Sequence, residues 1–331
     1  MSSKPKILVT RRLPEPVEAR LSADFEVILN HDDTLMSGQE IIDKLSGVDG
    51  VLVCPTDKCD EEFIGKLPQS IKILATFSVG YDHIDVNAAN KISLNITNTP
   101  DVLTDATADI ALLLLLGAAR GAHWGEQMVR QNTWGAWSPN HPLGIDVSGR
   151  KLGIFGMGRI GQAVAKRARG FDMEIHYHKR SQLSPDMEQS AVFHPTFESL
   201  LPQCDFLSIN CASTPETRGC LNSQTIELMP DGAVVINTSR GDIIDDDALI
   251  KALASGKLAA AGLDVFNNEP NIDTRYRTME NVFLLPHLGS ATPQTRIAMG
   301  MRAVDNLEQF FCGKIPHDLV SDHNNLKIKQ G

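Results

Sequence analysis

The stretch Lys151-Leu-Gly-Ile-Phe-Gly-Met-Gly-Arg-Ile-Gly161 decides the fold of this chain. A short apolar strand leads into a glycine-rich turn, a helical pattern follows, and a second strand begins at Glu174. A GxGxxG dinucleotide-binding fingerprint requires this succession of strand, turn, helix and strand. Gly156 permits the sharp turn, Gly158 lets the backbone approach a pyrophosphate, and Gly161 lets the helix pack closely on the sheet. The stretch therefore predicts a dinucleotide site, with the phosphates facing the amides at the start of the helix.

The residues after the second strand indicate which dinucleotide binds. Units that prefer NAD place an acidic residue at the end of this strand, about 20 residues after the glycines, where it binds the ribose 2′-hydroxyl. Here that position is His178, and Lys179, Arg180 and Ser181 follow. No carboxylate stands there to repel a 2′-phosphate, whereas two cations and a hydroxyl can bind one. We therefore expect NADPH/NADP as the cofactor, with NADH accepted less efficiently; the alternative is a solvated basic turn, with NAD held through backbone contacts.

Size and composition bound the class of protein. The chain has 331 residues, which fits two domains better than one. Its net charge of −10 argues against a nucleic acid or an anionic membrane as a partner. The six cysteines show neither a CxxC pair nor zinc spacing, and the N-terminus has no secretory pattern, so we expect reduced thiols, no metal and a cytoplasmic location. The most apolar stretch, Ile110–Ala119, is too short to span a membrane and predicts a buried helix.

Strands and helices alternate on both sides of the fingerprint. Upstream, the pattern predicts elements at Ile7–Val9, Pro16–Ser22, Phe25–Leu29, Gly38–Leu45, Gly50–Val53, Asp60–Lys66 and Ile73–Thr76. Downstream, it predicts strands at Phe206–Asn210, Ala233–Asn237, Ala260–Phe266 and Val282–Leu285. Thr99 and Pro100 are typical of an N-cap and a first helical residue, and they predict a helix that runs to Arg120. A last helix, from about Thr292 to Cys312, is expected to return to the N-terminal unit.

These patterns predict an α/β protein with two doubly wound parallel-sheet domains. We expect a Rossmann-type dinucleotide-binding domain at residues 100–288. A smaller, flavodoxin-like substrate-binding domain would be discontinuous, at residues 1–99 and 289–331, with a cleft between the two domains. All three tryptophans, Trp124, Trp134 and Trp137, lie in a segment rich in aromatic and turn residues. Such a segment often covers a neighbouring subunit; the alternative is a local cap on the dinucleotide-binding domain.

Three polar residues follow predicted strands of the dinucleotide-binding domain: Arg240, Glu269 and His287. Ligands of open α/β sheets bind outside the carboxyl ends of the strands, so we expect these side chains to meet the cofactor there. Arginine can bind the carboxylate and the keto oxygen of a 2-keto acid, and histidine can donate a proton. A glutamate on the other imidazole nitrogen can orient the ring and favour its protonated form. Each residue alone is more often structural; together they predict a hydride-transfer enzyme that acts on 2-keto acids.

Five ordered motifs, the fingerprint with Thr238–Gly241, Gly262–Val265, Asn268–Pro270 and Pro286–Ser290, resemble the D-2-hydroxyacid dehydrogenase family. The resemblance covers about residues 5 to 320 and is strongest to the glyoxylate/hydroxypyruvate reductases of that family. It implies a homodimer formed through the coenzyme domains. It also implies that substrate is bound by Val79, Gly80, Trp137, Arg240 and His287. The cofactor residues that it and the fingerprint imply are Thr104, Gly156, Gly158, Arg159, Ile160, Gly161, His178, Lys179, Arg180, Ser181, Cys211, Ala212, Thr238, Arg240, Asp264, His287 and Gly289.

The resemblance implies NADP(H)-dependent reduction of glyoxylate to glycolate and of hydroxypyruvate to D-glycerate. Asp264 is expected to bind the nicotinamide amide, and Glu269 argues against the related formate dehydrogenases, which carry glutamine there. Two alternatives stay open. One is an NAD-dependent D-2-hydroxyacid dehydrogenase for a bulkier 2-keto acid, and the other is a non-catalytic, dinucleotide-sensing binding protein.

Overall fold

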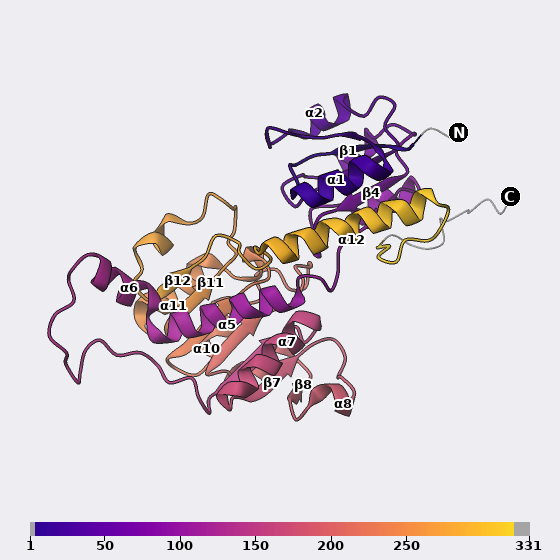
Figure 1. Ribbon diagram of the computed structural model, residues 1–331. Helices are drawn as coiled ribbons and strands as arrows, with labels where there is room; N and C mark the ends of the chain where they lie inside the picture. Colours follow the sequence, from indigo (N-terminus) through magenta and orange to yellow (C-terminus); the bar gives the residue numbers. More distant parts are fainter. Residues whose placement is uncertain (1–3, 321–331) are drawn as a thin grey trace. The chain divides into compact units, whose positions relative to one another are not determined.

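The computed structural model describes residues 4–320, which divide into two compact units. Unit 1 comprises the chain up to Leu103 together with the part from Thr292 on, and unit 2 runs from Thr104 to Ala291. Each unit is an α/β structure whose sheet strands pair in parallel (Figure 1). The expected fold class, with two parallel-sheet domains, is therefore confirmed. The domain limits expected above, 1–99 with 289–331 and 100–288, remain a prediction.

Unit 1 contains a five-stranded sheet in the order β2-β1-β3-β4-β5. Its strands are β1 (Lys6–Val9), β2 (Glu26–Ile28), β3 (Gly50–Val53), β4 (Ile73–Thr76) and β5 (Asn95–Thr97). Its helices are α1 (Glu15–Asp24), α2 (Gly38–Asp43), α3 (Glu61–Gly65), α4 (Val86–Lys91) and α12 (Pro293–Phe311). The order 2-1-3-4-5 is that of flavodoxin-like doubly wound sheets.

Both faces of the unit 1 sheet are buried. On β1, Ile7 and Val9 pack with α1 and α12, whereas Leu8 packs with the helices of the other face. Side chains of a strand alternate between faces, so a parallel sheet covered on both sides needs continuous apolar runs such as Ile7–Val9. The chain returns to this unit through α12, which begins after the N-cap Thr292 and buries Ala303 and Leu307 against the sheet.

Unit 2 contains a seven-stranded sheet in the order β12-β11-β10-β9-β6-β7-β8. Its strands are β6 (Lys151–Phe155), β7 (Glu174–His178), β8 (Val192–His194), β9 (Phe206–Ile209), β10 (Ala233–Asn237), β11 (Leu258–Leu263) and β12 (Val282–Leu284). Its α-helices are α5 (Thr104–Arg120), α6 (Ala122–Arg130), α7 (Arg159–Ala168), α8 (Pro185–Glu188), α9 (Phe197–Leu200), α10 (Ser223–Glu227) and α11 (Asp246–Ser255). From β8 onward this is the Rossmann order 3-2-1-4-5-6 with one further strand. The strand order reverses between β6 and β9, and this switch point is where dinucleotides bind in such sheets.

The sheet of unit 2 also has two apolar faces. On β10, Val234 and Ile236 pack with α5 and α7, which lie side by side in Figure 1, and Val235 packs with α11 on the other face. Among the described helices, none is by itself long and apolar enough to cross a membrane, and only the bent pair α5–α6 passes that test when joined. The central helix α5 buries Ala108 and Leu115 in the unit 2 core.

One predicted helix boundary was wrong. The helix expected to start at Thr99 and Pro100 begins at Thr104. Asp101 has a φ of +71°, which an α-helix does not allow, and the amide of Thr99 donates to the carbonyl of Ser78 at 2.9 Å. A tertiary hydrogen bond therefore holds this segment outside the helix. The strand expected at Ala260–Phe266 lies at Leu258–Leu263, and the edge strands β5 and β8 were not predicted.

Candidate active site

The glycine-rich turn between β6 and α7 forms a tight cradle. Gly156 has a φ of +99°, and a Cβ there would lie 2.4 Å from the amide nitrogen of Cys211. A Cβ on Gly161 would lie 2.3 Å from the carbonyl oxygen of Gly156, so α7 approaches the turn as closely as the backbone allows. A Cβ on Gly158 would meet nothing within 4 Å, which leaves open space beside the first turn of α7. This cradle fits the pyrophosphate of a dinucleotide.

Cys211 and Ala212 lie on the other side of the switch point, directly after β9. The backbone of Cys211 packs against Gly156, and its carbonyl accepts a hydrogen bond from the hydroxyl of Ser239. The carbonyl of Ala212 accepts from the hydroxyl of Thr217 at 2.7 Å. Burial raises the pKa of the Cys211 thiol, so this side chain is a neutral packing group. The structure brings both residues next to the fingerprint, and their contact with a cofactor remains a prediction.

His178 is the last residue of β7. The amide of Gly156 donates to the carbonyl of His178 at 2.9 Å, so this strand end lies beside the first glycine of the fingerprint. Lys179 is half-buried, whereas Arg180 and Ser181 are exposed. The carboxylate of Glu216 also lies near this segment, because the charge of Arg180 contributes to its lowered pKa. The largest cause of that lowering is a hydrogen bond from Thr214. The four residues expected to contact the 2′-phosphate thus stay together beside the glycine cradle.

The predicted histidine and glutamate meet at the carboxyl edge of the unit 2 sheet. Nδ1 of His287 lies 2.7 Å from Oε2 of Glu269, and Oε1 of Glu269 accepts from the amide of Phe266 at 2.7 Å. Because a carboxylate only accepts, the hydrogen of this bond belongs to Nδ1, and Nε2 is left to carry a transferable proton. Desolvation works to raise the pKa of Glu269, but hydrogen bonds from His287 and Phe266, and the charges of His287 and Arg240, outweigh it and lower the pKa. The ionised carboxylate orients the imidazole and stabilises its cation.

Asp264 holds the loop that presents this histidine. The amide of His287 donates to the carbonyl of Asp264 at 2.9 Å, and the amides of Leu288 and Gly289 donate to its carboxylate oxygens at 2.6 and 2.8 Å. His287 has a φ of +56°, a left-handed conformation that costs energy in a non-glycine residue. Burial raises the pKa of Asp264, and the two amides partly oppose the shift. The carboxylate therefore fixes a strained loop, and its expected bond to nicotinamide remains a prediction.

Arg240 follows β10 in a turn built by Asn237. The side chain of Asn237 accepts from the amide of Ser239 at 2.9 Å and donates to the carbonyl of Arg240 at 2.8 Å. This turn fixes the backbone from which the guanidinium extends. The guanidinium donates to the carbonyl of Ser239 at 2.9 Å, and its charge contributes to the lowered pKa of Glu269. The arginine, the glutamate and the histidine therefore share one edge of the sheet, as predicted from their strand ends.

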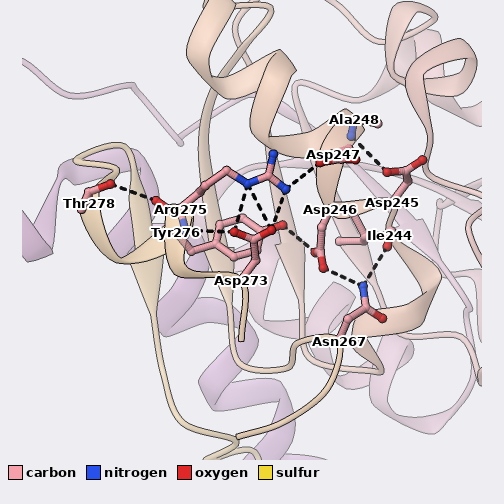
Figure 2. Close-up of polar contacts among 10 residues, drawn as sticks. All are labelled: Ile244, Asp245, Asp246, Asp247, Ala248, Asn267, Asp273, Arg275, Tyr276 and Thr278. Atoms are coloured by element: carbon pink, nitrogen blue, oxygen red, sulfur yellow. Dashed lines mark hydrogen bonds and ion pairs between the residues drawn. The ribbon is translucent and has the colours of Figure 1, made fainter. Parts of the chain in front are cut away.

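The loop that carries Glu269 is held to the start of α11 (Figure 2). Asp246 accepts from Nδ2 of Asn267 at 2.9 Å and from the hydroxyl of Tyr276 at 2.7 Å, so one carboxylate binds both ends of the loop. Desolvation and the hydrogen bond to Asp246 raise the pKa of the buried Tyr276 hydroxyl, which keeps it a donor. Other contacts in Figure 2 join Arg275 to Asp247 and Asp273, each at 2.6 Å.

Gly241 offers a test of how tightly this edge is packed. A Cβ there would lie 2.0 Å from the carbonyl carbon of Phe266 and 2.2 Å from the amide nitrogen of Asn267. Both atoms are backbone of the loop that leads to Glu269. We expect Gly241→Ala to cost about 1–3 kcal/mol, seen as a lower urea midpoint, and to slow catalysis because the loop shifts. Gly170→Ala, whose Cβ meets nothing within 4 Å, is the control, and equal midpoints for the two variants would contradict the prediction.

In unit 1, Val79 and Gly80 follow β4 in a turn whose carbonyls are bound to the protein. Nδ2 of Asn98 donates to the carbonyl of Val79 at 2.8 Å, and the hydroxyl of Ser78 donates to the carbonyl of Gly80 at 2.6 Å. Within residues 4–320, no hydrogen bond is found for the amides of Val79 and Gly80. Successive amides in a turn can bind an anion, and the expected binding of the substrate carboxylate here remains a prediction.

The other predicted residues have simpler surroundings. Thr104 is the first residue of α5, and the hydroxyl of Thr238 lies 3.5 Å from Oδ1 of Asn210. Trp137 is 83% exposed and lies in the segment after α6, where Trp134 is 68% exposed. The structure does not bring Trp137 to the residues described above within its own unit. Its expected role in a neighbouring subunit remains a prediction.

Sequence reasoning did not single out two histidines near His178. Nδ1 of His176 lies 3.0 Å from Nε2 of His194, and Nε2 of His176 lies 2.9 Å from Oε1 of Glu174. The alternation of Glu174, His176 and His178 along one strand was the available signal, because residues two apart share a face. The position of His194 on the neighbouring strand β8 could not be read from the sequence, because β8 itself was not predicted.

Comparisons with known proteins find one family of enzymes to which this chain is similar. Residues 112–289 match the family model described as D-isomer specific 2-hydroxyacid dehydrogenase, NAD binding domain. Glycerate dehydrogenase of Hyphomicrobium methylovorum is 44% identical over 94% of this chain and 97% of that protein. Glyoxylate reductase of Thermococcus litoralis is 41% identical over 96% of this chain and 97% of that protein. The NADPH-dependent glyoxylate/hydroxypyruvate reductase of Sinorhizobium meliloti, crystallised with NADP and malonate, is 36% identical with a TM-score of 0.86, over 96% of this chain and 97% of that one.

Proposed function

The chain belongs to the D-isomer specific 2-hydroxyacid dehydrogenase family, and from this premise we propose that it reduces glyoxylate to glycolate and hydroxypyruvate to D-glycerate, with NADPH preferred. It is an oxidoreductase with a Rossmann-type dinucleotide-binding domain. The observation that carries the proposal is the pair of His287 and Glu269, 2.7 Å apart at the edge of the sheet that also holds the glycine cradle. Ligands of doubly wound sheets bind at this edge.

The chain's own residues divide the work of reduction. When bound, a reduced nicotinamide supplies the hydride for the carbonyl carbon. Nε2 of His287 donates a proton to the keto oxygen as that oxygen gains charge, while Nδ1 keeps its bond to Glu269. Arg240 binds the substrate carboxylate and polarises the carbonyl. In unit 1, the amides of Val79 and Gly80 are the groups proposed to bind a substrate carboxylate.

The proposed substrates and cofactor are supported from two directions. Relatives of this chain carry the names glyoxylate reductase and glycerate dehydrogenase, which describe small 2-keto and 2-hydroxy acids. His178, Lys179, Arg180 and Ser181 stand where an NAD-preferring unit carries a carboxylate, and the similar Sinorhizobium meliloti enzyme is NADPH-dependent. NADH is proposed as a poorer alternative.

We also propose a homodimer formed through the coenzyme domains, acting in the cytoplasm. Helix α6 buries none of its residues, and the segment after it exposes Trp134, Trp137 and Leu143 by 68, 83 and 71%. Large exposed apolar side chains gathered in one segment mark an interaction surface. Sedimentation equilibrium of the wild-type protein and of Trp137→Ser would test the proposal, and a monomeric wild type would refute it.

Initial rates of reduced-nicotinamide oxidation test the proposed reaction. Glyoxylate and hydroxypyruvate are each assayed with NADPH and with NADH. Fast loss of absorbance with NADPH and slower loss with NADH is the expected result. Loss with NADH alone would overturn the cofactor preference and keep the reaction. No loss in any combination, together with loss on a bulkier 2-keto acid, would overturn the substrate proposal.

Arg180→Ala tests the contact with the 2′-phosphate. A charged hydrogen bond to phosphate is lost, so KM for NADPH is expected to rise about tenfold or more, while KM for NADH changes little. Steady-state kinetics with both cofactors measure the two values. The control is Arg150→Ala, an exposed arginine directly before β6, whereas Arg180 follows the end of the neighbouring strand β7. Equal increases in both KM values for Arg180→Ala would show structural damage in place of phosphate recognition.

A further inference from the structure

The hydrogen bond of His178 fixes which nitrogen of its ring bears a hydrogen. Nδ1 of His178 lies 2.8 Å from the carbonyl oxygen of His194. A carbonyl only accepts, so Nδ1 is the donor whether the ring is neutral or charged. For the residues that the structure describes, no hydrogen bond is found at Nε2 of His178. In the neutral ring, Nε2 is therefore the nitrogen that carries the lone pair.

The same ring is held beside the dinucleotide cradle. It stacks on Phe155 with ring centroids 5.9 Å apart and planes at 21°. Phe155 directly precedes Gly156, whose amide donates to the carbonyl of His178 at 2.9 Å. The stacking, the bond at Nδ1 and the backbone bond together restrict the ring at the position where the ribose 2′ group is recognised in Rossmann units.

A chain of hydrogen bonds supports the carbonyl that holds His178. The carboxylate of Glu174 accepts from Nε2 of His176, which leaves Nδ1 of His176 to accept from Nε2 of His194. Desolvation lowers the pKa of His194, the charges of His176 and His178 act in the same direction, and a backbone hydrogen bond at Ser199 partly opposes the shift. His176 and His194 act as positioning residues, because they act through the carbonyl on β8.

The charged groups around the ring come from several elements. They are Glu174 and His176 on β7, Lys179 and Arg180 directly after it, His194 on β8, and Glu216, which interacts with Arg180. Histidine is the side chain that changes charge between about pH 5 and pH 8.

We propose that His178 recognises both forms of the cofactor, the neutral ring accepting a hydrogen bond from the 2′-hydroxyl of NADH at Nε2 and the protonated ring donating one to the 2′-phosphate of NADPH. An aspartate at this position would repel the phosphate, and an arginine offers no acceptor to the hydroxyl. The preference for NADPH over NADH therefore increases as pH falls. This inference rests on the proposed function in one respect, which is that the ligand is a nicotinamide dinucleotide.

Equilibrium binding tests the proposal without turnover. The Kd values of NADPH and NADH are measured by cofactor fluorescence from about pH 8 to about pH 5. The ratio of the Kd of NADH to that of NADPH is expected to rise about tenfold across this range in the wild type. His178→Arg is the matched control, because its charge is constant and any remaining change reports the titration of the 2′-phosphate itself. In His178→Gln, the ratio of the Kd of NADH to that of NADPH should show the same pH dependence as in His178→Arg.

A ¹⁵N NMR titration of the histidine rings gives a second readout. The Nδ1 of His178 is expected to stay protonated throughout, and the Nε2 signal is expected to titrate and to shift when NADPH binds. A wild-type Kd ratio whose pH dependence equals that of His178→Arg would overturn the proposal, as would a ring that bears its hydrogen at Nε2 when neutral. If the pH dependence is present but no keto acid is reduced, the proposed function fails while this inference stands.

Discussion

His287→Asn is expected to lower kcat for keto-acid reduction by about 100- to 10,000-fold, because the proton donor is removed. The pair of His287 and Glu269 is the only proton-transfer group that we assign to the reaction, and its geometry is already formed at 2.7 Å. Asparagine has a similar size and still accepts and donates hydrogen bonds, so the loop after β12 should keep its shape. The Kd of NADPH is expected to change little. Steady-state and single-turnover kinetics measure the loss.

A matched control is His31→Asn, which changes an exposed histidine in a turn of unit 1. Its kcat is expected to equal that of the wild type. Turnover by His287→Asn within a few-fold of the wild type would rule out His287 as the proton donor. If His287→Asn weakens NADPH binding as well as lowering kcat, the substitution has disrupted the loop after β12 instead.

The carboxylate partner gives this prediction a pH dependence. The pKa of Glu269 is lowered, so its carboxylate stays ionised at every pH at which histidines titrate, and it stabilises the imidazolium of His287. Reduction needs that imidazolium, so the rate is expected to fall as pH rises and the proton is lost. In Glu269→Gln the stabilising charge is absent, and the fall should move to lower pH in the profile of kcat/KM. A profile unchanged in its alkaline limb would remove Glu269 from this role.

Arg240→Lys is expected to lower kcat/KM for glyoxylate by about 100- to 1000-fold although the positive charge is kept. Lysine is a point charge on a flexible chain, whereas the planar guanidinium can bind a carboxylate and a keto oxygen at once. The turn formed by Asn237 holds the backbone of residue 240, so the shorter reach of the new donor cannot be compensated by a shift of the chain. Most of the loss should appear in kcat, since the contact to the keto oxygen strengthens as charge develops.

Arg277→Lys serves as the control, because Arg277 is an exposed arginine of the same unit. Its kcat/KM is expected to match that of the wild type. A value for Arg240→Lys within a few-fold of the control would mean that charge alone suffices, and the bidentate role would be abandoned. Addition of guanidinium ion to Arg240→Ala should restore part of the activity if the side chain acts by direct contact.

The sequence predicted the architecture well, because its signals are local. The dinucleotide fingerprint depends only on residues that are close together in the sequence. They are the run Lys151–Phe155, the glycines from Gly156 to Gly161 and the amphipathic helix that follows. The strand Ala233–Asn237 was predicted at its observed bounds, since an apolar run such as Ala233–Ile236 is typical of a central parallel strand. Where the prediction failed, at Thr99, a hydrogen bond to the distant Ser78 overrode a sound local helix signal.

For the active site, strand ends alone predicted that Arg240, Glu269 and His287 would share an edge, because parallel strands bring their carboxyl ends to one side of a sheet. The sequence could not predict the distances between these side chains or the hydrogen bonds that hold their loops in place. The sequence did not show that the two carboxylate oxygens of Asp264 accept from the amides of Leu288 and Gly289, and its expected bond to nicotinamide stays a prediction. The binding of both ends of the Glu269 loop by Asp246 depends on a loop path that no local pattern encodes.

The sequence by itself determined the two-sheet α/β fold and the dinucleotide fingerprint, and it named the candidates for the reacting groups, because propensity, periodicity and glycine placement act over a few neighbouring residues. The tertiary structure alone decided which nitrogen of His287 and of His178 bears the fixed hydrogen, and which side chains hold the catalytic loop. Those properties depend on hydrogen bonds between residues 16 to 30 positions apart, such as His178 with His194 and Tyr276 with Asp246. Contacts at this separation form only when the sheet brings distant strands together.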